Sequence, residues 1–120
     1  MNEKNNIIKA LKSYKGDKIK AENIRERIAA IDPRFSVEGF DTIDKKSELE
    51  SQLKLLEAKI GIIERCLDVL TNDEKQVLKT LYIDREYRAA DKIAMRLSIS
   101  RTNVYYVRNR ALDKMSQMLN

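Results

Sequence analysis

The run DKIAMRLSISRTNVYYVRNRALDKM, from Asp91 to Met115, has the most informative pattern in the sequence. Its apolar residues recur three or four positions apart in two groups, one ending at Leu97 and the other beginning at Val104. This spacing is typical of helices that bury one face. Ser98, Ile99 and Ser100 lie between the groups and are poor residues for continuing a helix. The run therefore predicts two helices joined by a three-residue turn, a helix-turn-helix.

Residues in and beside the turn suit this arrangement. Ala94 is small where the second helix must cross the first, and Ile99 is apolar, so it can anchor the turn. Ser100 is a favourable N-cap, because its hydroxyl can accept a hydrogen bond from an otherwise unpaired backbone N–H of the next helix. The turn is thus expected to be rigid.

The second helix leaves a polar outer side, which we expect to enter a DNA major groove. Early residues of such a helix reach base edges, where arginine suits guanine and asparagine suits adenine. The alternative for these residues is ordinary surface polarity, and the later basic residues could contact phosphates or form salt bridges. Two adjacent tyrosines on a helix cannot face the same way, so one could pack inward. The predicted DNA-binding residues are Ser100, Arg101, Thr102, Asn103, Tyr105, Tyr106, Arg108, Asn109, Arg110 and Lys114.

The segments LTNDEKQVLKTLY (residues 70–82), KIAMRLSISRTNV and RALDKM together resemble region 4 of the bacterial sigma-70 factors. The chain departs from that family at Ser98, where glycine is usual and a positive φ is therefore costlier, and at Tyr105 and Tyr106, where sigma factors often carry arginine and glutamine. The resemblance implies DNA binding and RNA polymerase as a partner, without fixing the promoter −35 element as the target. The layout of the whole chain is similar to phage transcriptional activators of the ArpU and RinA type.

Composition narrows the class of function. Of 120 residues, 42% are hydrophobic and 36% charged, with three glycines and one proline, which favours a helical chain with large solvated faces. Histidine is absent, and this removes the commonest general base and metal ligand. We therefore expect no enzyme activity, no metal and no cofactor. Cys66 is the single cysteine, which excludes an internal disulfide and is expected to be a buried apolar residue.

The charge distribution and hydropathy of the chain indicate its binding partner and its cellular location. The net charge is +5, of which residues 71–120 carry +4, from ten basic and six acidic residues. Such a bias suits neutralisation of DNA phosphates. No apolar run is long enough for a membrane span and no signal peptide is evident, so a cytoplasmic location in a bacterium or a phage-infected host is expected.

The N-terminal part predicts a helical hairpin. Residues 3–31 are expected to form a helix that bends or breaks at Gly16, and Asp32-Pro33 ends it. The loop 33–43 is unusually apolar, since it contains Phe35, Val37 and Phe40, which either cap the hairpin or bind a partner. Six lysines in the first twenty residues form either a solvated face or a second phosphate-contacting arm.

A second long helix, capped by Asp41 or Asp44, carries an apolar seam at Leu49, Leu53, Leu56, Ile60, Ile63, Leu67 and Leu70. These spacings alternate between four and three, as in a coiled coil. The first helix is the expected antiparallel partner, with a second chain as the alternative. Leu55, Ile62, Cys66 and Val69 widen the apolar face, which favours a homodimer or higher oligomer.

Thr71 and Glu74 form the pattern of a capping box, which predicts a helix to about Tyr82, with Val77, Leu78 and Leu81 facing inward. The expected fold is therefore all-α, with a helical hairpin at residues 1–70 and a helix-turn-helix domain at residues 71–120. The expected function is sequence-specific regulation of transcription. A small terminase-like DNA-recognition subunit and a sigma mimic that binds polymerase without DNA are the alternatives.

Overall fold

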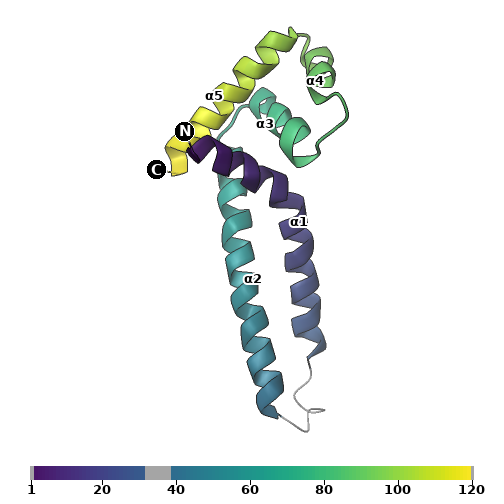
Figure 1. Ribbon diagram of the computed structural model, residues 1–120, viewed down its shortest axis with the longest axis vertical. Coiled ribbons are helices and arrows are strands. Elements are labelled where there is room, and N and C mark those ends of the chain that lie inside the picture. Colours follow the sequence, from purple (N-terminus) through teal and green to yellow (C-terminus); the bar gives the residue numbers. More distant parts are fainter. Residues whose placement is uncertain (1, 32–38, 120) are drawn as a thin grey trace. The chain divides into compact units, whose positions relative to one another are not determined.

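The structure is a computed structural model that describes residues 2–31 and 39–119. Its elements are α1 (Asn2–Ala30), α2 (Gly39–Asp68), α3 (Asn72–Leu78), the π-helix η2 (Lys79–Ile83), α4 (Ala89–Leu97) and α5 (Arg101–Leu119) (Figure 1). Within the described residues there is no strand, and the all-α prediction is confirmed. In that same part of the chain, no helix has both the length and the apolar character needed to cross a membrane.

The chain divides into two compact units. The first comprises residues 1–14 and 62–120, and the second comprises residues 15–61. The sequence had suggested a division at residue 70, but the first turns of α1 and the last turns of α2 belong with the C-terminal residues. The physical reason is burial: Ile7 and Leu11 of α1 lie in the same apolar core as Met115 of α5.

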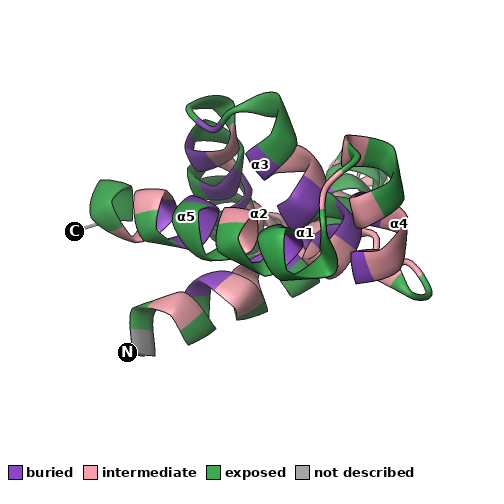
Figure 2. Ribbon diagram, turned by 90° about the horizontal axis from the view of Figure 1, so that it is seen from above, coloured by how far each residue is buried: buried purple, intermediate pink, exposed green. Residues whose placement is uncertain are grey.

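Two apolar clusters hold the first unit together. The larger one joins α1, α2, α3, η2 and α5 through Ile7, Leu11, Ile63, Cys66, Leu70, Leu78, Ile83, Ala111, Leu112 and Met115. The smaller one joins α3, α4 and α5 through Val77, Ala90, Ile93 and Val104. The buried positions of α5 form one side of that helix, and its opposite side is exposed (Figure 2). Cys66 is buried, as predicted, and its burial raises the pKa of the thiol.

The segment from Thr71 to Ile83 starts as predicted and ends differently. The capping box is present: the Glu74 backbone N–H donates to the Thr71 hydroxyl at 3.2 Å, and the Thr71 backbone N–H donates to Oε1 of Glu74 at 2.9 Å. From Lys79 onward the helix widens into the π-helix η2, where the Asp84 N–H donates to the Lys79 carbonyl at 2.7 Å.

The widened turn of η2 changes which side chains face inward. Val77 and Leu78 are fully buried as predicted, whereas Leu81 is half-buried against the smaller cluster. Ile83 is buried in the larger cluster. Residues of both α3 and η2 thus contribute to both clusters.

In the second unit, the segments of α1 and α2 run antiparallel. Arg25 pairs with Glu57 at 3.1 Å, and Lys59 pairs with the buried carboxylate of Asp17 at 3.1 Å. Helix α1 continues through Gly16, so of the expected bend or break the break is absent.

Helix α2 begins at Gly39, before both aspartates that had been expected to cap it. Its seam residues are buried or half-buried, whereas Leu55 is 74% exposed. The predicted placement of Phe35, Val37 and Phe40 lies outside the residues whose side chains are described.

Candidate nucleic-acid interface

The connection between α4 and α5 is a three-residue turn held by hydrogen bonds. Ser98 ends α4 with φ 55° and ψ 45°, the left-handed conformation in which glycine is usually favoured. The Ile99 N–H donates to the Ala94 carbonyl at 3.0 Å, and the Asn103 N–H donates to the Ser100 hydroxyl at 3.1 Å. Ser100 is therefore the N-cap of α5, as predicted, and its hydroxyl is used inside the protein.

An apolar wedge fixes α5 against α4. Ile93 and Val104 are fully buried at the crossing. Around them lie the half-buried side chains of Leu81, Ala94, Leu97, Ile99 and Val107. Because a β-branched valine is stiff at χ1, Val104 holds the start of α5 in one orientation. The side of α5 opposite Val104 is thereby presented to solvent.

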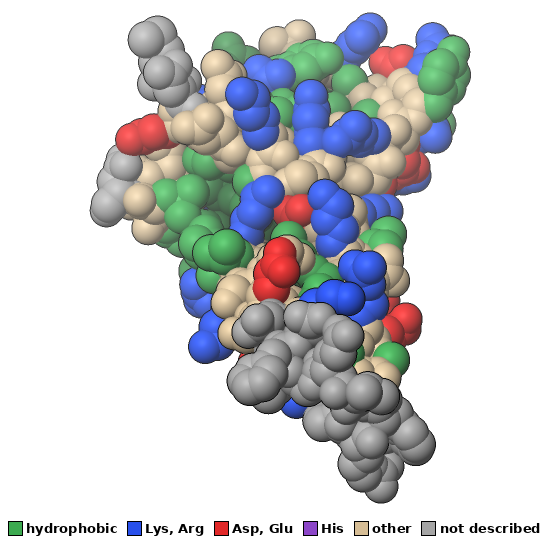
Figure 3. All heavy atoms as spheres, turned by 60° about the horizontal axis from the view of Figure 1, so that its bottom comes forward, with side chains coloured by type: hydrophobic (Ala, Val, Ile, Leu, Met, Phe, Trp, Pro, Cys, Tyr) green, Lys and Arg blue, Asp and Glu red, His purple; other side chains and the backbone are tan. Residues whose placement is uncertain are grey.

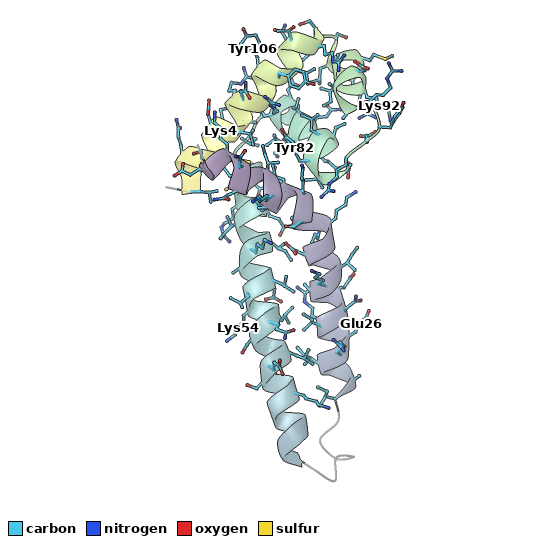
Figure 4. The ribbon with its side chains drawn as sticks, in the orientation of Figure 1. Lys4, Glu26, Lys54, Tyr82, Lys92 and Tyr106 are labelled. Atoms are coloured by element: carbon cyan, nitrogen blue, oxygen red, sulfur yellow. The ribbon has the colours of Figure 1, made fainter. Side chains whose placement is uncertain are left out.

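The exposed side of α5 carries a polar strip with helical spacing. Thr102, Tyr106 and Asn109 are four and three residues apart, so they lie on one face, and all three are exposed. Tyr106 is 69% exposed and projects away from the core (Figure 4). Arg101 and Asn103 are also exposed and flank the strip at its N-terminal end. These five residues form what we call the outer strip of α5.

The two adjacent tyrosines are both exposed, so the inward packing that was open to one of them is not seen. Tyr105 is 36% exposed, about half the exposure of Tyr106, and the guanidinium of Arg108 lies 4.9 Å from the centre of its ring. Arg108 also donates from Nε and Nη2 to Oδ1 of Asn109, at 3.1 and 2.9 Å. This arrangement orients Arg108 along α5, and among the described residues no carboxylate pairs with it.

Arg110 and Lys114 behave differently from the other predicted contacts. Nε of Arg110 donates to Oε2 of Glu74 at 2.9 Å, and Nζ of Lys114 donates to Oε1 of the same carboxylate at 2.8 Å. Glu74 is completely buried, whereas the side chains of Arg110 and Lys114 are 58% and 41% exposed. Of the two roles considered from the sequence, phosphate contact and salt bridge, the structure shows the salt bridge for both residues.

This buried carboxylate is strongly acidic. Burial alone would raise the pKa of Glu74, but hydrogen bonds from Lys114, from the Thr71 backbone and from Arg110 outweigh it and lower the pKa to about 2. Glu74 is therefore ionised at neutral pH, and the group of three side chains carries a net charge of +1.

Charges on α4 and the loop before it are mostly paired. Glu86 accepts two hydrogen bonds from Arg96, at 3.0 and 3.1 Å, which hold its pKa below the usual value. Asp91 lies 3.3 Å from Nε of Arg88 and 3.7 Å from Nε of Arg101. The pair with Arg101 links α4 to the first turn of α5. At 3.7 Å between exposed side chains this contact is weak, so Arg101 can leave Asp91 and bind another anion.

The positive charge of the chain belongs to the unit that contains α4 and α5. Residues 1–14 and 62–120 hold 14 Lys and Arg against 9 Asp and Glu, a net charge of +5, while residues 15–61 hold ten of each. Lysine and arginine side chains are prominent on the face drawn in Figure 3, with carboxylates among them. A surface with this bias attracts polyanions.

Two groups of contacts in this unit cannot be predicted from the sequence. Glu74 had been assigned to the capping box alone, because its partners are 36 and 40 residues away and no local spacing signals them. Lys4 of α1 pairs at 2.6 Å with Asp113, the single carboxylate of α5, and Ser116 donates to Glu3 at 2.8 Å. The first turn of α1 is therefore tied to the C-terminal half of α5.

Comparisons with known proteins find no matching family model, no matching curated protein and no matching solved structure.

Proposed function

We propose that the chain is a sequence-specific DNA-binding protein that regulates transcription. The observation that carries the proposal is the outer strip of α5. It is polar, exposed and held by a capped turn and a buried wedge, in the unit that carries the whole net charge of +5. A helix presented in this way fits a major groove, which is about 12 Å wide.

The chemistry of the strip supports readout of base edges. Arg101 and Asn103 begin the helix, and their side chains suit guanine and adenine. Thr102 and Tyr106 can contact a thymine methyl group or a phosphate. Arg108, aligned along α5 by Asn109, provides a neighbouring cation for the sugar-phosphate backbone.

The resemblance of residues 70–115 to sigma region 4 extends this proposal. On that basis we propose control of a promoter or late operon, as in phage-type activators, with bacterial RNA polymerase as a partner and a homodimer or higher oligomer as the working form. A sigma mimic would keep the fold and lose duplex binding, so the same DNA experiment separates the two.

Fluorescence anisotropy on a random-sequence duplex tests the proposal. We expect binding that weakens steeply as salt rises, because displaced counterions return to the DNA. On a selected site, Arg101→Ala should weaken binding by about 1–3 kcal/mol and relax the preference at one base pair. Absent binding, or binding that does not change with salt, would remove the DNA proposal.

A further inference from the structure

The group formed by Glu74, Arg110 and Lys114 does more than join α3 to α5. Its carboxylate is fully buried, and the two cations that cover it are about half exposed. A buried charge needs partners, and one cation could have met this need. The second cation leaves the group with a positive charge that the described contacts do not neutralise.

Donors remain on both cations after Glu74 is satisfied. A guanidinium has five N–H groups, and Arg110 uses Nε toward Glu74, which leaves its two terminal amino groups. An ammonium has three N–H groups, and one bond from Lys114 to Glu74 is seen. These remaining donors belong to neighbouring side chains, because residues 110 and 114 are four apart on one helix.

The carboxylate also fixes where these donors lie. Glu74 is itself held by the Thr71 backbone N–H at 2.9 Å, at the capped start of α3. Long basic side chains lose considerable rotamer freedom when they bind an anion. Arg110 and Lys114 have already lost part of that freedom, so an anion meets a prearranged pair.

The position along α5 identifies the anion. Residues 101 to 109 span about 12 Å at ~1.5 Å per residue, which matches the width of the major groove. Arg110 and Lys114 lie roughly 13 and 20 Å from Arg101 along the helix axis, at the edge of the groove and beyond it. A helix seated by its outer strip would bring them to the sugar-phosphate wall.

We propose that Arg110 and Lys114, set in place by the buried Glu74 carboxylate, form a binding site for one phosphate group of the DNA backbone. This inference rests on the proposed function, since the phosphate belongs to a duplex that the outer strip of α5 engages. The site carries no sequence information. It positions the helix, as phosphate contacts do in general.

The test is a salt series on the full chain with Lys114→Gln, which removes the charge and keeps an N–H donor for Glu74. Anisotropy on a random duplex should show the slope of log affinity against log salt reduced by about one. The ratio of affinities at 50 and 200 mM salt should then fall roughly fourfold. Arg65→Gln makes the same change in net charge on another helix, α2, and should leave the slope unchanged.

Other results would overturn the proposal. If Arg110 and Lys114 only form ion pairs with Glu74 and do not contact DNA, Lys114→Gln keeps the wild-type slope. A loss of slope equal in Arg65→Gln and Lys114→Gln would mean a general effect of charge, without a site. If Lys114→Gln does not fold, Arg110→Gln gives the same test, since Lys114 still pairs with Glu74. A wild-type chain that binds no duplex defeats the proposed function, whereas binding with an unchanged slope in these variants defeats the phosphate site alone.

Discussion

Replacement of Glu74 by glutamine should destabilise the protein at neutral pH and have little effect in strong acid. The substitution keeps the size of the side chain and removes the charge that Arg110 and Lys114 share. In the folded protein the pKa of Glu74 is about 2, against an ordinary value of 4.5. At roughly 1.4 kcal/mol per pH unit, this difference corresponds to about 3 kcal/mol.

The sign of the pH dependence follows from linkage. Because folding lowers the pKa of Glu74, its contribution is fully present above pH 4.5 and is lost as the pH falls through about 2. Urea unfolding followed by circular dichroism, for the wild type and Glu74→Gln between pH 7 and 2, measures the difference directly. The two curves of free energy of unfolding should lie about 3 kcal/mol apart at pH 7 and converge in acid.

Asp73→Asn is the matched control, since Asp73 lies in the same first turn of α3 and is exposed. It should cost less than about 1 kcal/mol, the size of an exposed charge-dipole interaction. A Glu74→Gln variant as stable as the control at pH 7, or a difference that persists unchanged at pH 2, would refute the buried ion-pair reasoning.

Four further predictions concern the turn, the larger core and the oligomer. Ser98→Gly should raise the free energy of unfolding by up to about 1 kcal/mol in urea titrations, because it relieves the positive φ of 55°; a loss of stability would contradict the assigned backbone. Ser100→Ala should lower it by ~1 kcal/mol through loss of the cap, and no loss would mean that the hydroxyl does not cap α5. Burial and the hydrogen bond to Glu64 raise the pKa of Tyr14 from 10.0 to about 12, so Tyr14→Phe should remove an absorbance transition at about pH 12. The contribution of Tyr14 to stability is present below pH 10 and is lost as the pH rises through 12. A transition at about pH 12 that survives the substitution would refute the assignment. Sedimentation should show a dimer that Leu55→Glu weakens, because this leucine is 74% exposed; a monomer at micromolar concentration would contradict the oligomer.

Local patterns allowed much of the fold to be predicted. The capping box at Thr71, the N-cap at Ser100 and the left-handed Ser98 depend on residues within four positions of each other, where sequence spacing and geometry are directly related. The buried Ile93 and Val104 also followed from helical periodicity. Tertiary pairing could not be predicted in the same way.

The features that escaped prediction join residues far apart in the chain. Glu74 meets Lys114 across 40 positions, and Lys4 meets Asp113 across more than 100. The burial of Ile7 and Leu11 beside Met115, which moves the unit boundary, has the same origin. The π-helix at Lys79 could not be predicted either, because its sequence KTLYI fits an α-helix equally well.

Sequence-specific binding by the outer strip of α5 can be tested by selecting bound duplexes from a random pool, for the wild type and for a variant with Thr102 and Asn103 changed to alanine. Both residues are exposed and belong to the outer strip of α5. We expect that the wild type enriches a defined sequence and that the variant enriches a different or degenerate one. Enrichment of the same sequence by both proteins, or of none by the wild type, would contradict the claim that this strip reads DNA.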